Sequence, residues 1–182
     1  GIRSNSTSLY VRQQPRVALV STTGTEKNRK PIDPPPFVEL QVERRVDPSQ
    51  HFLNNPYIFS TVTLYKADVD QDYDDTPGKS LAGTFVSSAN RLKNEVNIDG
   101  CYFVFGDISV KVVGTYRLKF SVYEMRKDGQ GVVVYLGAVI SDKFQVQTQK
   151  DFQGLSESNY LTKSFHEQGM HLRIRKEPRT TL

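Results

Sequence analysis

A short cationic cluster is the first feature of the sequence with a chemistry of its own. Lys27, Asn28, Arg29 and Lys30 are consecutive in the sequence. Ammonium and guanidinium groups neutralise phosphates, and arginine or asparagine can also bond the edges of bases. The cluster therefore indicates a surface for a polyanion, with double-stranded DNA as the specific candidate. The alternative is a solvated patch whose charges only keep the protein soluble.

Further cations could extend this surface. Arg44 and Arg45 end the predicted strand that follows the cluster. Because consecutive strand residues face opposite sides of a sheet, at most one of the two is expected on the surface of the cluster, unless the strand has already ended. Weaker candidates lie near the C-terminal end, where they could equally be the solvent face of a last strand: Arg173, Arg175 and Lys176.

The charge is unevenly distributed along the chain. The formal net charge is only +4, but residues 1–30 hold six Lys/Arg against one Glu. Residues 66–79 contain five aspartates, and this acidic segment is the part expected to be disordered because like charges repel and little in it can be buried. A polyanion is therefore expected to meet only part of the surface.

The prolines after the cluster indicate a stiff backbone. In "RKPIDPPPF" each proline fixes its own φ and pushes the residue before it towards extended conformations. A stiff segment loses less entropy when it is ordered by a ligand. The segment could instead serve as a P-x-x-P ligand from Pro31 to Pro34, which would require it to stand clear of the domain. The strand "FVELQV" follows without a spacer, which favours a segment packed at the edge of the fold.

Other kinds of chemistry find little support in the sequence. His166 and His171 are five residues apart and separated by a glycine, so they do not match a helical zinc site. The aspartates at 68, 70 and 72 have the spacing of a calcium loop, but Tyr73 stands where that loop needs glycine. Cys101 lies in an apolar run that is typical of a core strand. We therefore expect no enzyme activity, no metal and no cofactor.

The elements that position these residues show a periodicity of two. In "FVELQV" and "TYRLKFSVYEM" apolar and polar residues alternate, as in strands with one buried face. The pattern predicts an all-β, immunoglobulin-like antiparallel sandwich of about nine strands. The expected strands are "RVALV", "FVELQVERRV", "YIFSTVTLY", "LAGTFVS", "CYFVFGDISV", "TYRLKFSVYEM", "GVVVYLGAVI", "KFQVQT" and "MHLRIR".

One segment departs from this pattern. Leu161 and Phe165 are four residues apart, and Gly169 is placed to end a helix, which predicts a short helix over about 159–168. We expect a flexible N-terminal segment over 1–14 and a single domain over 15–179. No apolar run is long enough for a membrane span, and no secretory signal is visible.

Three blocks of the sequence resemble the fungal velvet domain. They are "NRKPIDPPPFVELQV", "CYFVFGDISVKVVGTYRLKFSVYEM" and "DFQGLSESNYLTKSFHEQGMHLRIRKEPR". The resemblance implies a nuclear regulator of sporulation, spore viability and secondary metabolism. Its fold would resemble the N-terminal DNA-binding domain of Rel/NF-κB factors. It would bind promoter DNA as a homodimer, or as a heterodimer with another velvet protein of the VelB type.

By its position, the cluster at residues 27–30 corresponds to the early loop with which Rel-like domains enter the major groove. The resemblance thus assigns DNA contacts to these residues first and to Arg44 and Arg45 second. The alternative is a protein-interaction module that acts on transcription indirectly. A single domain must dimerise through its own surface, and the sequence offers two candidate apolar patches, around Tyr160 and Phe165 or around Tyr102 and Phe103.

Overall fold

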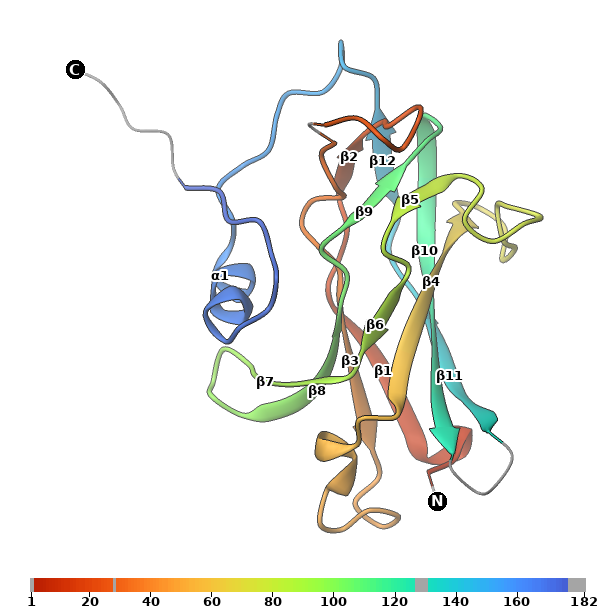
Figure 1. The fold of residues 1–182 in the computed structure, drawn as a ribbon, viewed down its shortest axis with the longest axis vertical. Coiled ribbons are helices and arrows are strands. Elements are labelled where there is room, and N and C mark those ends of the chain that lie inside the picture. Colours follow the sequence, from red (N-terminus) through yellow and green to blue (C-terminus); the bar gives the residue numbers. More distant parts are fainter. Residues whose placement is uncertain (1, 28, 127–130, 177–182) are drawn as a thin grey trace.

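Two packed β-sheets form the fold in the computed structural model, which describes residues 2–27, 29–126 and 131–176 (Figure 1). The first sheet has the order β1-β3-β8-β7, and the second has the order β2-β12-β10-β4-β6 with β11 paired to β10. A short pair, β5-β9, completes the sandwich. The predicted all-β sandwich is confirmed.

The strands of the first sheet are β1 (Thr7–Gln13), β3 (Phe37–Val42), β7 (Asn90–Lys93) and β8 (Asp99–Val104). Those of the second sheet are β2 (Val17–Leu19), β4 (Ile58–Lys66), β6 (Val86–Ser88), β10 (Gly114–Arg126), β11 (Val132–Ile140) and β12 (Phe144–Gln147). The short pair is β5 (Leu81–Gly83) with β9 (Ile108–Val110), and two 3-10 turns, η1 (Ser4–Ser6) and η2 (His51–Asn54), precede β1 and β4.

The core lies between the inner faces of the two sheets. Leu118, Phe120 and Val122 project inward from β10 and are fully buried, as are Val38 and Leu40 from β3. These are the apolar members of the alternating patterns, so the period-two pattern also identifies the buried face. Cys101 is a free, buried thiol in this core, and burial raises its pKa to about 12, which keeps it protonated and unreactive.

The N-terminal residues differ from the prediction. Residues 1–14 were expected to be a flexible segment, but Thr7–Gln13 form β1, which pairs antiparallel with β3 along its length. Leu9 and Val11 pack against the core from this strand. Their alternation with polar neighbours is the signal that the prediction did not use.

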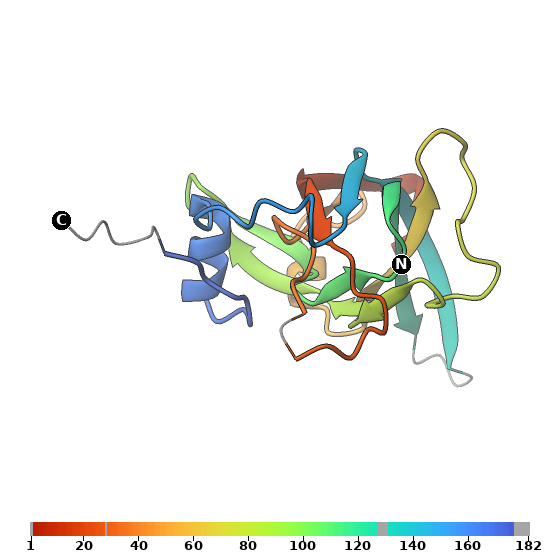
Figure 2. The same cartoon turned by 90° about the horizontal axis from the view of Figure 1, so that it is seen from above.

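The predicted helix is confirmed as α1 (Tyr160–Glu167). Asn159 caps it by accepting a hydrogen bond from the Thr162 amide at 2.9 Å. Phe165 anchors it, because its ring lies 4.7 Å from that of Phe37 and 4.9 Å from that of Tyr102. Figure 2 shows α1 beside the β7–β8 hairpin, on the opposite side of the molecule from the acidic segment.

That acidic segment is ordered, contrary to expectation, because cations of the neighbouring strands and loops pair with it. Arg117 contacts Asp70 at 2.9 Å and Lys143 contacts Asp68 at 2.6 Å. Asp74 accepts hydrogen bonds from the amide and hydroxyl of Ser80. Opposite charges therefore offset the like-charge repulsion on which the prediction of disorder rested.

The predicted last strand is also absent, since residues 171–176 form neither helix nor strand. None of the described strands pairs with this segment. Hydrogen bonds from the Arg173 and Arg175 side chains hold it against the domain instead. Within the described residues, no helix has the length and hydropathy required to cross a bilayer.

Candidate nucleic-acid interface

The loop between β2 and β3 carries the cationic cluster across one end of the sandwich (Figure 1). Backbone hydrogen bonds fasten it to the strands beneath. The Ser21 amide donates to the carbonyl of Val110 at 2.9 Å, and the Ile32 amide donates to that of Ile108 at 2.8 Å. The loop is thus packed on the end of the fold, as the absence of a spacer before β3 predicted, and does not project as a free arm.

Arg29 anchors this loop from within. Its side chain is only 15% exposed, and Nη2 donates to Asp107 Oδ1 at 2.5 Å. The same guanidinium reaches Ser109 at 3.4 Å. A guanidinium already engaged by a carboxylate has fewer donors left for DNA. Arg29 therefore holds the loop on the β9 side of the sandwich more directly than it can serve a phosphate.

Lys27 and Lys30 are the members of the cluster that face solvent. Within the described part of the chain, neither of them forms an ion pair. The Lys30 ammonium lies 5.6 Å from the centre of the Phe152 ring, which restrains its side chain without neutralising it. Asn28, the remaining member, lies outside the described residues.

Glu26 organises the turn that carries these lysines. Its carboxylate accepts hydrogen bonds from the Ser21 hydroxyl and, at 3.1 Å, from the Thr23 amide. These donors favour the charged form, and they lower the Glu26 pKa to about 2. The carboxylate is occupied by local donors, so the acidic residue in the cluster stabilises its shape without forming an ion pair with Lys27.

The C-terminal segment joins this end of the molecule through side chains. Arg173 Nη1 donates to the carbonyl oxygen of Arg29 at 2.8 Å. Arg175 pairs with Asp33 and also donates to the carbonyl of Ser156 at 2.7 Å. Of the three weaker sequence candidates, the fold therefore brings Arg173 to the cluster and Arg175 to the proline segment beside it, whereas Lys176 is exposed and has no contact with either among the described residues. Arg173 is exposed and adds its charge there, whereas Arg175 is half-buried and fastens the proline segment.

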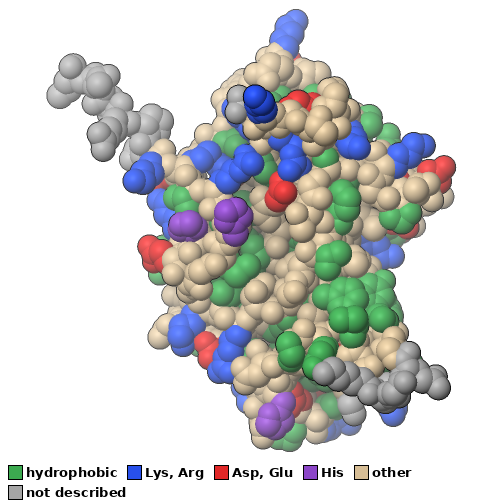
Figure 3. Space-filling model, in the orientation of Figure 1, with side chains coloured by type: hydrophobic (Ala, Val, Ile, Leu, Met, Phe, Trp, Pro, Cys, Tyr) green, Lys and Arg blue, Asp and Glu red, His purple; other side chains and the backbone are tan. Residues whose placement is uncertain are grey.

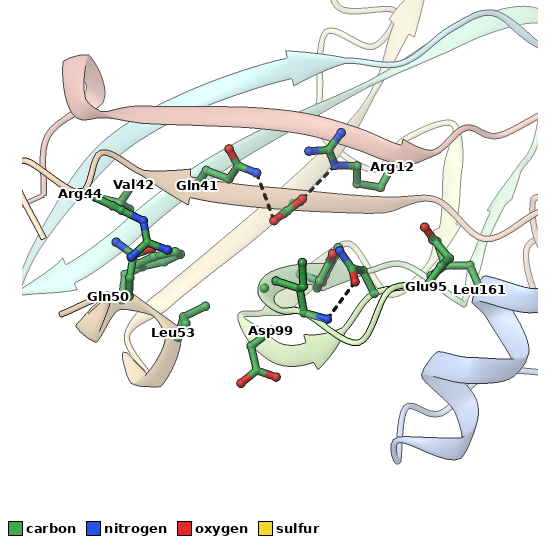
Figure 4. A pocket seen from close by; sticks show the side chains of 15 residues that line it. Arg12, Gln41, Val42, Arg44, Gln50, Leu53, Glu95, Asp99 and Leu161 are labelled. Atoms are coloured by element: carbon green, nitrogen blue, oxygen red, sulfur yellow. Dashed lines mark hydrogen bonds and ion pairs between the residues drawn. The ribbon is translucent and has the colours of Figure 1, made fainter. Parts of the chain in front are cut away.

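Arg44 and Arg45, the second-ranked candidates, lie at the opposite end. They follow β3, whereas the cluster precedes it, so the length of the strand separates them (Figure 1). Arg45 pairs with Glu43 at 2.9 Å. Arg44 lines a cavity of about 660 Å³ on the outer face of the first sheet, together with the ion pair of Arg12 and Glu39 (Figure 4). The structure therefore does not bring Arg44 and Arg45 together with the cluster.

Two cations that the sequence analysis did not single out belong to the same end. Lys111 follows β9, and its side chain lies close beneath Gly24, within about 3 Å of where a Cβ would stand. Lys150 is exposed just after β12, whose Gln147 carbonyl bonds the Val20 amide at the start of the loop. Figure 3 shows Lys and Arg side chains gathered over this end of the molecule. No local sequence signal marks them, because they reach the cluster only through strand pairing.

The described residues hold no group of three or more His, Cys, Asp or Glu side chains that could bind a metal ion. His166 and His171, which were compared with a zinc motif above, are both exposed at the end of α1 and in the segment after it. The cationic end is thus the most distinctive chemical feature of the described surface. We name it the basic end, and it comprises Lys27, Lys30, Lys111, Lys150 and Arg173.

A comparison with known families identifies the fold's relatives. The family model described as "Velvet factor" matches residues 7–76 and 69–179, nearly the whole chain. This chain belongs to the velvet family. A velvet protein of Cochliobolus sativus, the spore development regulator vosA, is 50% identical over 96% of this chain and 57% of its own length. The spore development regulator RYP2 of Ajellomyces capsulatus is 44% identical over the whole of this chain and 46% of its own.

A third relative, from Chaetomium globosum, is named as a component of the velvet complex and is 49% identical over 94% of this chain and 38% of its own. The velvet domain described here thus spans about half or less of these relatives. Relatives named as vosA or VOSA spore development regulators are among those found. These relatives are fungal regulators of spore development.

Proposed function

We propose that this velvet domain binds promoter DNA through its basic end and so regulates sporulation, spore viability and secondary metabolism in a fungal nucleus. The observation that carries the proposal is the convergence of cations from separate segments at one end of the sandwich. Lys27 and Lys30 come from the loop, Lys111 from the end of β9 and Arg173 from the C-terminal segment. Several phosphates along one duplex could be neutralised at once.

The residues divide into two roles in this proposal. The exposed lysines contact phosphates and supply most of the affinity, whereas Arg29 and Arg175 hold the loop and the proline segment through Asp107 and Asp33. Base readout falls to Arg173, with Asn28 as a second candidate on the ground of its residue type alone. A loop ordered before DNA arrives loses little entropy on binding.

The domain acts as a homodimer or as a heterodimer with another velvet protein in this proposal. One of the relatives is named as a component of a velvet complex, which supports pairing between velvet proteins. Two domains side by side present two basic ends, and a duplex with two half-sites would be bound by both. The proposed function requires no cofactor.

Selection of bound duplexes from a random pool, followed by a salt titration on the selected and a scrambled duplex, tests this function. DNA binding predicts that log K falls with log salt by about 0.9 per phosphate contacted, with the selected duplex bound more tightly at every salt concentration. Absence of duplex binding at low salt, with tight binding to another velvet domain, would instead support the protein-interaction module.

A further inference from the structure

Part of the outer face of the second sheet is unusually apolar for a solvated antiparallel sheet. Where β11, β10, β4 and β6 lie side by side, the register aligns their outward-facing residues in rows. Tyr135, Tyr123 and Phe59 form one row across three strands, with Val133 and Met125 on the next. A further row is Ala138, Ser121, Thr61 and Val86. These rows contain no charged side chain.

The aromatic members contact one another across the strands. The rings of Phe59 and Tyr123 stack at 5.6 Å, and those of Tyr123 and Tyr135 meet edge-on at 5.7 Å. Several side chains on this face are about half exposed: Tyr135 at 51%, Met125 at 50%, Val133 at 50% and Val86 at 52%. Figure 3 shows the hydrophobic side chains gathered over β4, β10 and β11.

This face, which we call the outer apolar face, is separate from the core. Its residues Phe59, Tyr123, Met125, Val133, Tyr135 and Val86 pack into neither hydrophobic cluster of the interior. The candidate patches proposed from sequence are different: Phe165, Tyr102 and Phe103 are buried, and only Tyr160 is exposed. Neither candidate is thus an exposed apolar patch like the outer apolar face, to which a bulge in β11 contributes.

We propose that the outer apolar face packs against the same face of a second copy of this chain. The inference rests on the proposed function, because it names the surface through which the proposed dimer forms. An occupant must itself be uncharged there, because a charge buried against this face would lose its hydration without gaining a partner. The described surface of this domain supplies such a face, and two antiparallel sheets pack well face to face.

The charges around the face agree with a two-fold arrangement. Lys119, one row beyond Ser121, and Arg117 beyond it lie on the same side of β10. Arg117 is already paired with Asp70, and the Lys119 ammonium lies over the Tyr65 ring at 5.5 Å. Of these two cations, Arg117 therefore already has an acidic partner within the chain. If the two copies are related by a two-fold axis near Tyr123, their Lys119 residues lie at opposite ends of the contact and do not repel each other.

The arrangement also leaves the DNA surface open. The apolar rows lie near Phe59 at the start of β4, whereas the basic end lies beyond the other end of that strand (Figure 1). Pairing through the outer apolar face therefore covers none of Lys27, Lys30 or Arg173. The exposed part of the face is on the order of 500 Å² per copy, below a standard interface, so the dimer is expected to dissociate at micromolar concentrations.

Sedimentation velocity of the whole chain over concentrations from about 1 to 300 µM tests the assignment. The unaltered protein is expected to show a reversible monomer–dimer equilibrium. Tyr135→Glu and, separately, Val86→Glu each place a charge on the face and should weaken the dimer at least tenfold. Ile98→Glu is the matched control, because Ile98 is 60% exposed on the β7–β8 hairpin, away from the face. Thermal unfolding checks that each variant is folded.

The inference is overturned if the unaltered chain stays monomeric throughout, or if folded Tyr135→Glu and Val86→Glu dimerise as well as the control. Fluorescence anisotropy on a short duplex, measured over the same protein concentrations, separates this result from that of the proposed function. A dimer broken by the two variants in a protein that binds no duplex would support the interface and contradict DNA binding. Duplex binding by a chain that forms no dimer would support DNA binding and contradict the interface.

Discussion

Arg173 donates a hydrogen bond from Nη1 to the carbonyl oxygen of Arg29 at 2.8 Å, across 144 residues of sequence. This contact joins the C-terminal segment to the loop that carries the cationic cluster, and it places the Arg173 charge beside Lys30. Arg173→Ala should therefore weaken duplex binding several-fold, and Arg173→Lys should restore the charge without the same hydrogen bond. Equal affinity of Arg173→Ala and the unaltered protein would remove Arg173 from the basic end.

The loop depends on Arg29 for its attachment. Arg29→Ala removes the ion pair with Asp107 and the contact with Ser109, so the free energy of unfolding should fall by about 1–2 kcal/mol. Lys30→Ala is the control, since an exposed side chain without an ion pair should change stability by less than about 0.5 kcal/mol. Urea unfolding followed by circular dichroism measures both. Equal stability of the two variants would show that Arg29 does not anchor the loop.

The carboxylate of Glu26 gives the loop a pH dependence. Its folded pKa of about 2 lies below the ordinary value of 4.5, so the charged form is favoured by folding. The contribution is fully present above the ordinary value and is lost as the pH falls through about 2. The NMR shift of the Thr23 amide, which donates to Glu26, should thus stay constant from neutral pH to well below 4.5.

Glu26→Gln provides the reference for that titration, because the amide keeps the shape but cannot be ionised. Its Thr23 amide shift should differ from that of the unaltered protein at neutral pH and show no Glu26 titration. A midpoint near the ordinary value of 4.5 in the unaltered protein would contradict the proposed role of the Ser21 and Thr23 hydrogen bonds.

The burial of Phe165 predicts a stability effect without an effect on association. Phe165→Ala removes a fully buried ring that contacts Phe37 and Tyr102, and should cost about 3–5 kcal/mol. Tyr160→Ala on the same helix is the control, since Tyr160 is 67% exposed. Chemical unfolding measures the cost, and sedimentation of the folded fraction should show the same monomer–dimer equilibrium. A small stability change would contradict the packing described for α1.

Local patterns in the sequence predicted most of the fold. The alternation in "TYRLKFSVYEM" identified β10 and its buried face, and the spacing of Leu161 and Phe165 identified α1, because both signals depend on residues a few positions apart. The segment "MHLRIR" has the same alternation as a strand but finds no sheet edge to pair with. Its arginines bond backbone and carboxylate groups instead, which no periodicity could indicate.

The candidate site was predicted only in part for the same reason. Lys27 and Lys30 were found because they are adjacent in sequence, whereas Lys111 joins them only through the course of β9. The sequence could not distinguish Arg29 from the neighbouring lysines, because its ion pair is with Asp107, which is far away in the sequence. The structure places Arg44 and Arg45 away from the cluster, because closeness in sequence across a strand becomes separation by the length of that strand.

The most direct test of DNA binding by the basic end compares two matched double variants on one selected duplex. Lys27→Ala/Lys30→Ala and Arg44→Ala/Arg45→Ala each remove two exposed cations from a loop next to β3. Fluorescence anisotropy across a salt series should show the first variant losing about two units of the log K against log salt slope, and the second behaving as the unaltered protein. Equal losses in the two variants, or no loss in the first, would contradict the account.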